Sequence, residues 1–210
     1  MQKIAIVAQL YSGLENVIDR KHWEHSGSPA YFHFIKHLDQ ANNFDYQLYL
    51  LSKSHSKENI QKKLVVDNLK NPITVIPYYK FFLSDSINFF KKIEFFYNKS
   101  RQYLIVLKAS KMTNCFYVDR DNLLLTFLLL LFMKKKVITR LLGVTNILYS
   151  HLAEKNNLYS KLIRWVFSHP NSYFICSKDG SYADLVEKKL GKPRFNLMFN
   201  GVNKKEFSLN

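Results

Sequence analysis

Short apolar runs alternate along the chain with segments of helical periodicity, and this alternation restricts the possible fold more than any other feature. The first run, residues 3–8, is apolar from Ile4 to Val7, as expected for a strand buried on both faces. Similar runs follow at residues 46–51, 73–77, 115–118, 137–141, 173–176 and 195–199. Strands that alternate with helices at this spacing form parallel sheets with helical crossovers. We therefore expect an α/β fold with a doubly wound, mostly parallel sheet.

Helical segments are predicted between these runs. One begins near Pro29, one runs from about residue 86 to at least 99, and others lie at 122–133, 156–167 and 180–189. Residues 103–109 suit either a continuation of the second helix or a strand, and the helix is favoured. No repeat, low-complexity tract or flexible linker interrupts the pattern, so we expect one domain over residues 1–200.

The most apolar segment, residues 123–133, is interrupted only by Thr126. As a helix it would be roughly 16 Å long, whereas a bilayer core is about 30 Å thick. Asp121 and Asn122 before it are candidate N-caps, and the lysines that follow it, residues 134–136, suit the negative end of the helix dipole. We expect a buried helix that does not span a membrane.

The chain is strongly basic. It has 31 Lys and Arg against 16 Asp and Glu, a formal charge of +15, and 47% hydrophobic residues. The composition excludes disorder, and the charge favours nucleic acid, anionic lipid or nucleotide phosphate as partners without choosing among them. Cys115 and Cys176 stand far apart, and no secretory leader is apparent, so a reducing, cytoplasmic location is expected.

Two arginines are candidate substrate-binding residues, because open parallel sheets bind ligands at the carboxyl ends of their strands. Arg120 follows the run 115–118 between two carboxylates, and Arg140 lies within the run 137–141. Each guanidinium could bind a phosphate or a hydroxyl-rich ring. The alternative is a structural role, which for Arg120 would be a surface ion pair with Asp119 or Asp121.

Other motifs are weaker. Gly27 and Ser28 stand where a helix begins, which suits either a bound anion or a plain turn. The chain lacks the glycine patterns of dinucleotide sites and P-loops and the nucleophile elbow of hydrolases. His33 and His37 share a helix face but lack the further ligands of a zinc site, so no metal is predicted.

The helix predicted after residue 85 combines aromatic and basic residues. Helical spacing places Leu83, Ile87, Phe90, Ile93 and Tyr97 on one stripe that is expected to face the sheet. Lys91, Lys92, Phe95 and Lys99 are then expected on the opposite side. That side suits either an anionic membrane surface or ordinary solvent.

The C-terminal stretch carries a family resemblance. The run 173–177, the helical segment after it and the run 195–199 lead into Asn200, Gly201 and Val202, with Phe207 five positions on. This resembles the end of the N-terminal domain of glycosyltransferase family 4, whose members have the GT-B fold of two Rossmann-like domains. The resemblance extends loosely over the chain, with Gly27 at the family's first glycine loop and Gly143 after Arg140 where many members have His-Gly.

The resemblance implies a Rossmann-like N-terminal half of a GT-B fold. Residues 201–210 would begin the crossing to a C-terminal donor-binding domain, which is absent, since none of the seven glutamates has another eight positions on. The implied substrate-binding residues are Gly27, Ser28, Arg120, Arg140, Gly143, Ser177, Asn200 and Gly201. Asn203 and Leu142 depart from the family pattern.

The implied function is acceptor binding in a glycosyltransferase. A hexosyl group would pass from a nucleotide sugar, the co-substrate, to a lipid-linked or polysaccharide acceptor at the inner face of the plasma membrane, without a cofactor. The chain alone would be inactive unless a C-terminal domain completed it. The alternative is a non-catalytic Rossmann-like module whose basic surface binds nucleic acid or a protein partner. No RNP, helix-turn-helix, KH or zinc-finger signature supports nucleic acid.

Overall fold

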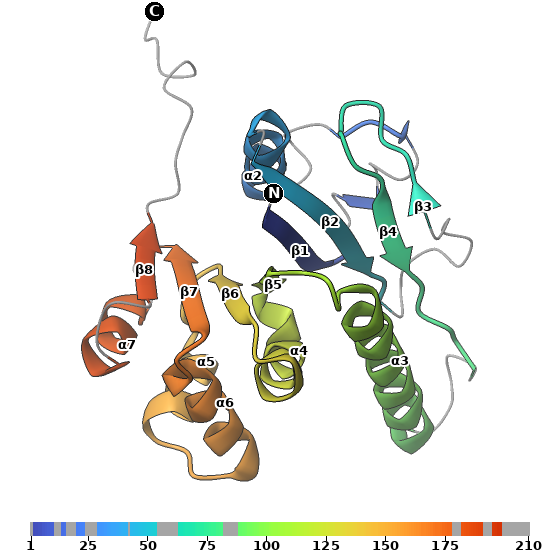
Figure 1. Cartoon of the computed structure of the whole chain (residues 1–210). Coiled ribbons are helices and arrows are strands. Elements are labelled where there is room, and N and C mark those ends of the chain that lie inside the picture. Colours follow the sequence, from blue (N-terminus) through green and yellow to red (C-terminus); the bar gives the residue numbers. More distant parts are fainter. Residues whose placement is uncertain are drawn as a thin grey trace, which may run out of the picture. The chain divides into compact units, whose positions relative to one another are not determined.

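The computed structural model describes residues 2–10, 14–15, 20–23, 29–41, 43–53, 63–81, 88–177, 182–190 and 195–198 (Figure 1). The chain divides into two compact units, Met1–Leu125 and Thr126–Asn210. Each unit consists of strands and helices in alternation, as the sequence predicts, and the fold is Rossmann-like α/β. The single domain expected over residues 1–200 stays a prediction.

The first unit has a sheet in the order β3-β4-β2-β1-β5. Its strands are β1 (Gln2–Gln9), β2 (Phe44–Leu51), β3 (Lys63–Leu64), β4 (Ile73–Ile76) and β5 (Cys115–Asp119). All neighbours are parallel except β3 and β4. The side chains from Ala5 to Ala8 in β1 are completely buried, because the sheet is covered on both faces.

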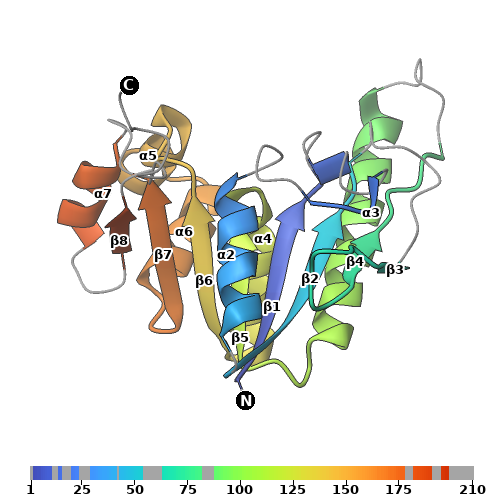
Figure 2. The same ribbon diagram turned by 90° about the horizontal axis from the view of Figure 1, so that it is seen from above.

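Two long helices cover this sheet. The helix α2 (Pro29–Gln40) and the helix α3 (Asn88–Ala109) lie on opposite faces, as Figures 1 and 2 show. From α2, Tyr31, Ile35 and Leu38 are buried, at the spacing of one helix face. The continuation of α3 through residues 103–109 confirms the helical interpretation of that stretch.

The inward face of α3 differs from the prediction. The buried residues of this helix are Glu94, Asn98, Gln102, Tyr103 and Val106, three of them polar. Phe90, Ile93 and Tyr97, which were expected to face the sheet, are exposed instead. The predicted orientation is therefore wrong for these three, and Leu83 and Ile87 lie outside the described residues.

Hydrogen bonds to the segment after β4 explain why α3 turns its polar side inward. Glu94 accepts from the backbone nitrogen of Phe81 at 2.7 Å through Oε2, and Arg101 donates to the Pro77 carbonyl at 3.0 Å. The Gln102 amide donates to the Ser52 carbonyl at 3.0 Å. Buried backbone groups need hydrogen-bond partners. In α3 these hydrogen bonds stabilise the fold more than burial of the phenylalanine side chains would, so the polar side of the helix faces inward.

The apolar segment 123–133 forms the helix α4 (Leu123–Leu128) followed by a π-helical turn, Leu129–Met133. Leu129 is completely buried, whereas Phe132 on the other side is exposed. The segment is thus buried along one side only. Within the described residues no helix is both long and apolar enough to cross a membrane.

The second unit continues with three parallel strands in the order β6-β7-β8. Its elements are β6 (Lys136–Leu141), α5 (Asn146–Ala153), α6 (Leu158–Ser168), β7 (Ser172–Ser177), α7 (Ala183–Leu190) and β8 (Phe195–Met198). Thr145 caps α5 by accepting from the backbone nitrogen of Leu148, and Asn157 caps α6 in the same way. The two-residue strand β3 and the helix α5 were not predicted from the sequence.

Candidate functional site

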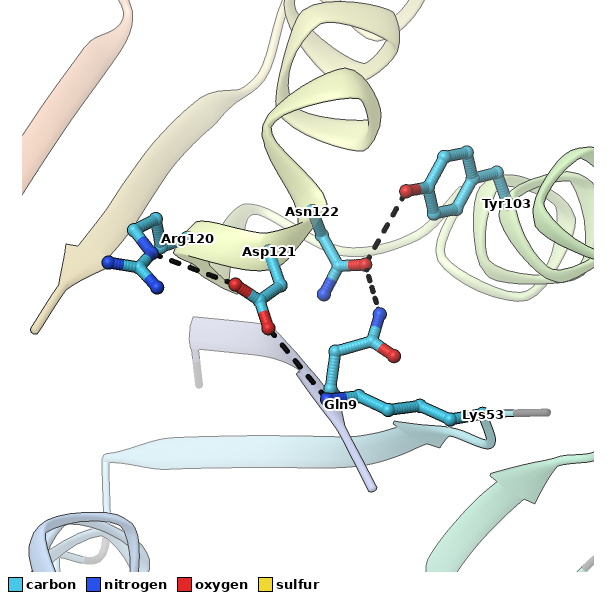
Figure 3. Close-up of polar contacts among 6 residues, drawn as sticks. All are labelled: Gln9, Lys53, Tyr103, Arg120, Asp121 and Asn122. Carbon is cyan, nitrogen blue, oxygen red and sulfur yellow. Dashed lines mark hydrogen bonds and ion pairs between the residues drawn. The ribbon is translucent and has the colours of Figure 1, made fainter. Parts of the chain in front are cut away.

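The carboxyl ends of β1, β2 and β5 meet at one edge of the first unit. Gln9, the last residue of β1, is in register with Leu51 at the end of β2, and Val7 is in register with Val118 of β5. Residues that follow these strands therefore come together although they are far apart in sequence. Figure 3 shows the resulting group: Gln9, Lys53, Tyr103, Arg120, Asp121 and Asn122. We call it the strand-end cluster.

Asp121 is shared by two cations of the strand-end cluster (Figure 3). Its Oδ2 lies 3.9 Å from Lys53 Nζ, and its Oδ1 lies 3.6 Å from Arg120 Nε. Both distances exceed those of a hydrogen bond, so these are loose ion pairs at the protein surface, which stabilise little. Arg120 thus makes one of the ion pairs that the structural alternative predicted, and its role in binding stays a prediction.

Beneath these charges lies a buried network of amides. Gln9 and Asn122 are almost fully buried, and Gln9 Nε2 lies 2.6 Å from Asn122 Oδ1 (Figure 3). The Tyr103 hydroxyl donates to the same Asn122 oxygen at 3.5 Å. Buried polar side chains keep a defined geometry only when they are paired, so this network holds the buried side of the strand-end cluster in one arrangement.

Lys99 reaches the same network from α3. With the Gln9 amide turned so that its oxygen faces the ammonium, Gln9 Oε1 accepts from Lys99 Nζ at 2.6 Å and Gln9 Nε2 donates to the Leu51 carbonyl at 3.3 Å. An ammonium group can only donate, so this orientation satisfies Lys99 and Gln9. It replaces the hydrogen bond from Gln9 Nε2 to Asn122 Oδ1, and the Asn122 amide must turn as well so that its nitrogen donates to the Gln9 oxygen. The Lys99 amine also lies 5.7 Å from the centre of the Tyr103 ring, within cation–π range.

Burial lowers the pKa of Lys99 to about 8, although the Asp121 carboxylate acts in the opposite direction and Lys53 lowers it further. Removing an ammonium from water disfavours its charged form. Lys99 is partly buried, whereas Lys91 and Lys92 on the same helix are exposed. Its ammonium group contacts the strand-end cluster and does not lie on the solvent-facing surface where the helical spacing placed it.

The outer face of α3 is apolar. Its exposed large side chains are Phe89, Phe90, Ile93, Phe96, Tyr97 and Leu104. Phe95 and Lys92 are exposed beside them, with the Phe95 ring centre 6.0 Å from that of Phe96 and Lys92 one helical turn from both Phe89 and Phe96. Lys91 is exposed on the opposite side of the helix. Surfaces of this kind are uncommon on soluble domains unless they bind a partner or a membrane. We call these six side chains the outer face of α3.

The second unit holds three of the predicted site residues. Arg140 is half-buried in β6 and in register with Ile175 of β7. Gly143, which follows β6, is buried and has φ of 123°, a conformation that favours glycine. Ser177 ends β7 and is buried. Because β6 and β7 are parallel, Gly143 after β6 and Ser177 at the end of β7 lie at the same edge of this sheet.

The remaining predicted site residues, Gly27, Ser28, Asn200 and Gly201, lie outside the described residues. Within the described ranges no group of three His, Cys, Asp or Glu could hold a metal ion. Cys115 and Cys176 are free thiols.

Sequence reasoning missed Gln9, Lys53 and Asn122 as members of a site. The signal available was positional, since Gln9 ends an apolar strand and Lys53 closely follows another. The family models searched include none that matches this chain, and no curated protein is significantly similar to it. The function is therefore inferred from the residues themselves.

Proposed function

We propose that the chain provides the acceptor-binding part of a glycosyltransferase that acts at an anionic membrane surface. A hexosyl group would pass from a nucleotide sugar to a lipid-linked or polysaccharide acceptor. The donor would be held by a second domain, as in the GT-B enzymes that the sequence resembles. The Rossmann-like fold is consistent with this role but common to many functions, so it does not carry the proposal.

The observation that carries the proposal is the double role of α3. Its inner side brings Lys99 and Tyr103 to the strand-end cluster, while its outer face exposes Phe89 and Phe96 with Lys92 beside them. A lipid-linked acceptor needs a polar site for its head and a membrane contact for its tail. One helix that serves both would hold the polar site close to the bilayer.

In this mechanism the strand-end cluster binds and orients the acceptor. Arg120 supplies donors suited to hydroxyl and phosphate groups, and the buried amides of Gln9 and Asn122 support the cluster from below. Arg140, Gly143 and Ser177, together with Gly27, Ser28, Asn200 and Gly201, are the further candidate contacts. The second domain would stabilise the leaving diphosphate, the main source of rate in such a reaction.

Acceptor binding is the test. The chain is titrated with soluble oligosaccharides and with short prenyl-diphosphate-linked sugars, and Arg120→Gln is compared with Lys70→Gln, an exposed lysine on the same unit. We expect Arg120→Gln to weaken binding of a charged acceptor about tenfold and Lys70→Gln to change it little. Tighter binding to single-stranded RNA than to any acceptor would contradict the proposal and favour a nucleic-acid-binding module.

A further inference from the structure

Three cations converge at the strand-end cluster, from three separate elements. Lys53 follows β2, Arg120 follows β5 and Lys99 comes from α3. Lys53 and Arg120 flank one carboxylate of Asp121, and Lys99 lies close enough to both Lys53 and Asp121 for their charges to shift its proton equilibrium. Such a concentration of like charge is unfavourable unless something offsets it.

Among the described residues, the carboxylates at this edge are fewer than the cations. Asp121 is bound loosely by both of its partners, at 3.6 and 3.9 Å. Asp119 at the end of β5 is buried and has contacts of its own. Counting both carboxylates, the described residues at this edge comprise three cations and two anions, an excess of one positive charge.

Neutral hydrogen-bonding groups line the same edge. Gln9 and Asn122 are buried below the cations. The Ser52 hydroxyl, buried next to Lys53, has no hydrogen-bond partner within the described part of the chain. A buried hydroxyl without a partner costs free energy, and a bound group could relieve that cost.

We propose that Lys53, Lys99 and Arg120 form a binding site for a phosphate group, and that this phosphate is part of the sugar acceptor. The first half of this proposal follows from the charges and contacts alone. The second half rests on the proposed function. A phosphate or diphosphate offers several acceptor oxygens, which match two ammonium groups and a guanidinium brought together from three separate elements.

Because Lys99 titrates, the affinity of this site for an anion should depend on pH. Burial lowers its pKa to about 8, with Asp121 opposing and Lys53 adding to the shift. A bound dianion would raise that pKa again, because an opposite charge favours the ammonium form. Above pH 8 binding must therefore take up a proton, and anion affinity should fall as the pH rises from 7 to 9.

The direct test uses inorganic sulfate, a phosphate-shaped dianion whose own charge is constant over this pH range. Sulfate is titrated calorimetrically into the wild-type chain, Lys99→Gln, and the control Lys91→Gln from the exposed part of the same helix. We expect Lys99→Gln to weaken binding about tenfold and to flatten the pH dependence. Lys91→Gln should stay within about twofold of wild type. Equal affinity of Lys99→Gln and wild type would overturn the site.

A second readout avoids dependence on the variant's folding. The lysine Cε resonances of wild-type protein are followed by NMR from pH 6 to 11, with and without sulfate. One resonance should titrate near pH 8 without sulfate and at higher pH with it, and it should be missing from Lys99→Arg spectra. A Lys99 resonance that sulfate does not move would refute the site.

The source of the phosphate is tested separately. Hexose 1-phosphates and vesicles that contain phosphatidic acid are compared with sulfate and with the free hexose. Tighter binding of hexose 1-phosphate than of either sulfate or the vesicles supports the acceptor assignment. If sulfate binds through Lys99 but the sugar phosphates bind no better, the acceptor half is wrong while the anion site stands. If acceptors bind but Lys99→Gln leaves them unaffected, the anion site is wrong while the proposed function stands.

Discussion

The side-chain amide of Asn98 binds the backbone of Tyr79 at both ends, with Oδ1 accepting from the Tyr79 nitrogen at 2.8 Å and Nδ2 donating to the Tyr79 carbonyl at 2.8 Å. Asn98 is completely buried in the middle of α3. The amide thus imitates a strand partner for the segment that leaves β4. This relationship sets the rotation of α3, and with it both the outer face of α3 and the position of Lys99.

Replacing Asn98 should destabilise the protein more than an average substitution. Asn98→Ala removes both bonds and leaves the two Tyr79 backbone groups without their partner, a loss of about 1–3 kcal/mol in the free energy of unfolding. Urea denaturation of Asn98→Ala beside Ser100→Ala, an exposed serine of the same helix, measures it. Equal stability of the two variants would mean that Asn98 does not position α3.

The outer face of α3 should bind anionic vesicles. Phe89→Ser and Phe96→Ser each remove an aromatic side chain that is 64% exposed, so flotation should decrease without loss of stability. Met112→Ser, at an exposed methionine outside this face, is the matched control. Recovery that is unchanged in both phenylalanine variants would exclude this face as the membrane contact.

Lys92, which lies beside that face, should contribute to the preference for anionic lipid. Lys92→Gln should lower affinity for vesicles that contain phosphatidylglycerol about fivefold, since a lysine near such a surface contributes about 1 kcal/mol. Binding to pure phosphatidylcholine should change little. Equal recovery of the wild type with the two kinds of vesicle would contradict an electrostatic contribution.

Glu94 should influence the titration of Tyr78. Burial raises the pKa of Tyr78 to about 12, and the Glu94 carboxylate adds to the shift. Because the unfolded phenol ionises near pH 10, the folded state loses stability as the pH rises from about 10 to 12. Glu94→Gln keeps an acceptor for Phe81 but removes the charge, so it should reduce this alkaline loss.

Tyrosine Cζ NMR provides the measurement and its internal control. The Tyr78 resonance should titrate at lower pH in Glu94→Gln than in wild type. The pKa of Tyr46, raised by burial and by Asp39, should not move. A Tyr78 titration that Glu94→Gln leaves unchanged would show that burial alone sets it.

Substitutions in the apolar segment 123–133 should lower the stability of the protein on one side of the helix only. Leu129 is completely buried, so Leu129→Ala should cost about 2–5 kcal/mol through lost burial and the cavity left behind. Phe132 is 69% exposed, and Phe132→Ala should cost far less. Similar losses in the two variants would indicate that this segment packs differently.

The strands were predictable from the sequence, because a run such as Ile4–Val7 can only be buried in a sheet covered on both faces. The rotation of α3 was not predictable from its hydrophobic spacing. A prediction from that spacing assumes that apolar residues face inward. Glu94 and Asn98 face inward instead, because they accept hydrogen bonds from the backbone nitrogens of Phe81 and Tyr79. The strand β3 is too short to carry a periodic signal.

The candidate site was predictable only in part. Arg120 could be proposed because it follows a strand, and the same rule, applied to polar residues at every strand end, would have found Gln9 and Lys53. Lys99 could not be found in this way. Its position depends on the rotation of α3 and on the contact with Gln9, which only the folded chain creates.

Calorimetry on the 210-residue chain compares how it binds sugar donors and sugar acceptors. Nucleotide sugars and free nucleoside diphosphates are titrated in one series, and sugar acceptors with and without phosphate in another. If this chain is the acceptor-binding part, phosphorylated acceptors should bind measurably, and nucleotide sugars should bind with millimolar or weaker affinity. Micromolar binding of a nucleotide sugar, with no acceptor bound, would contradict the assignment.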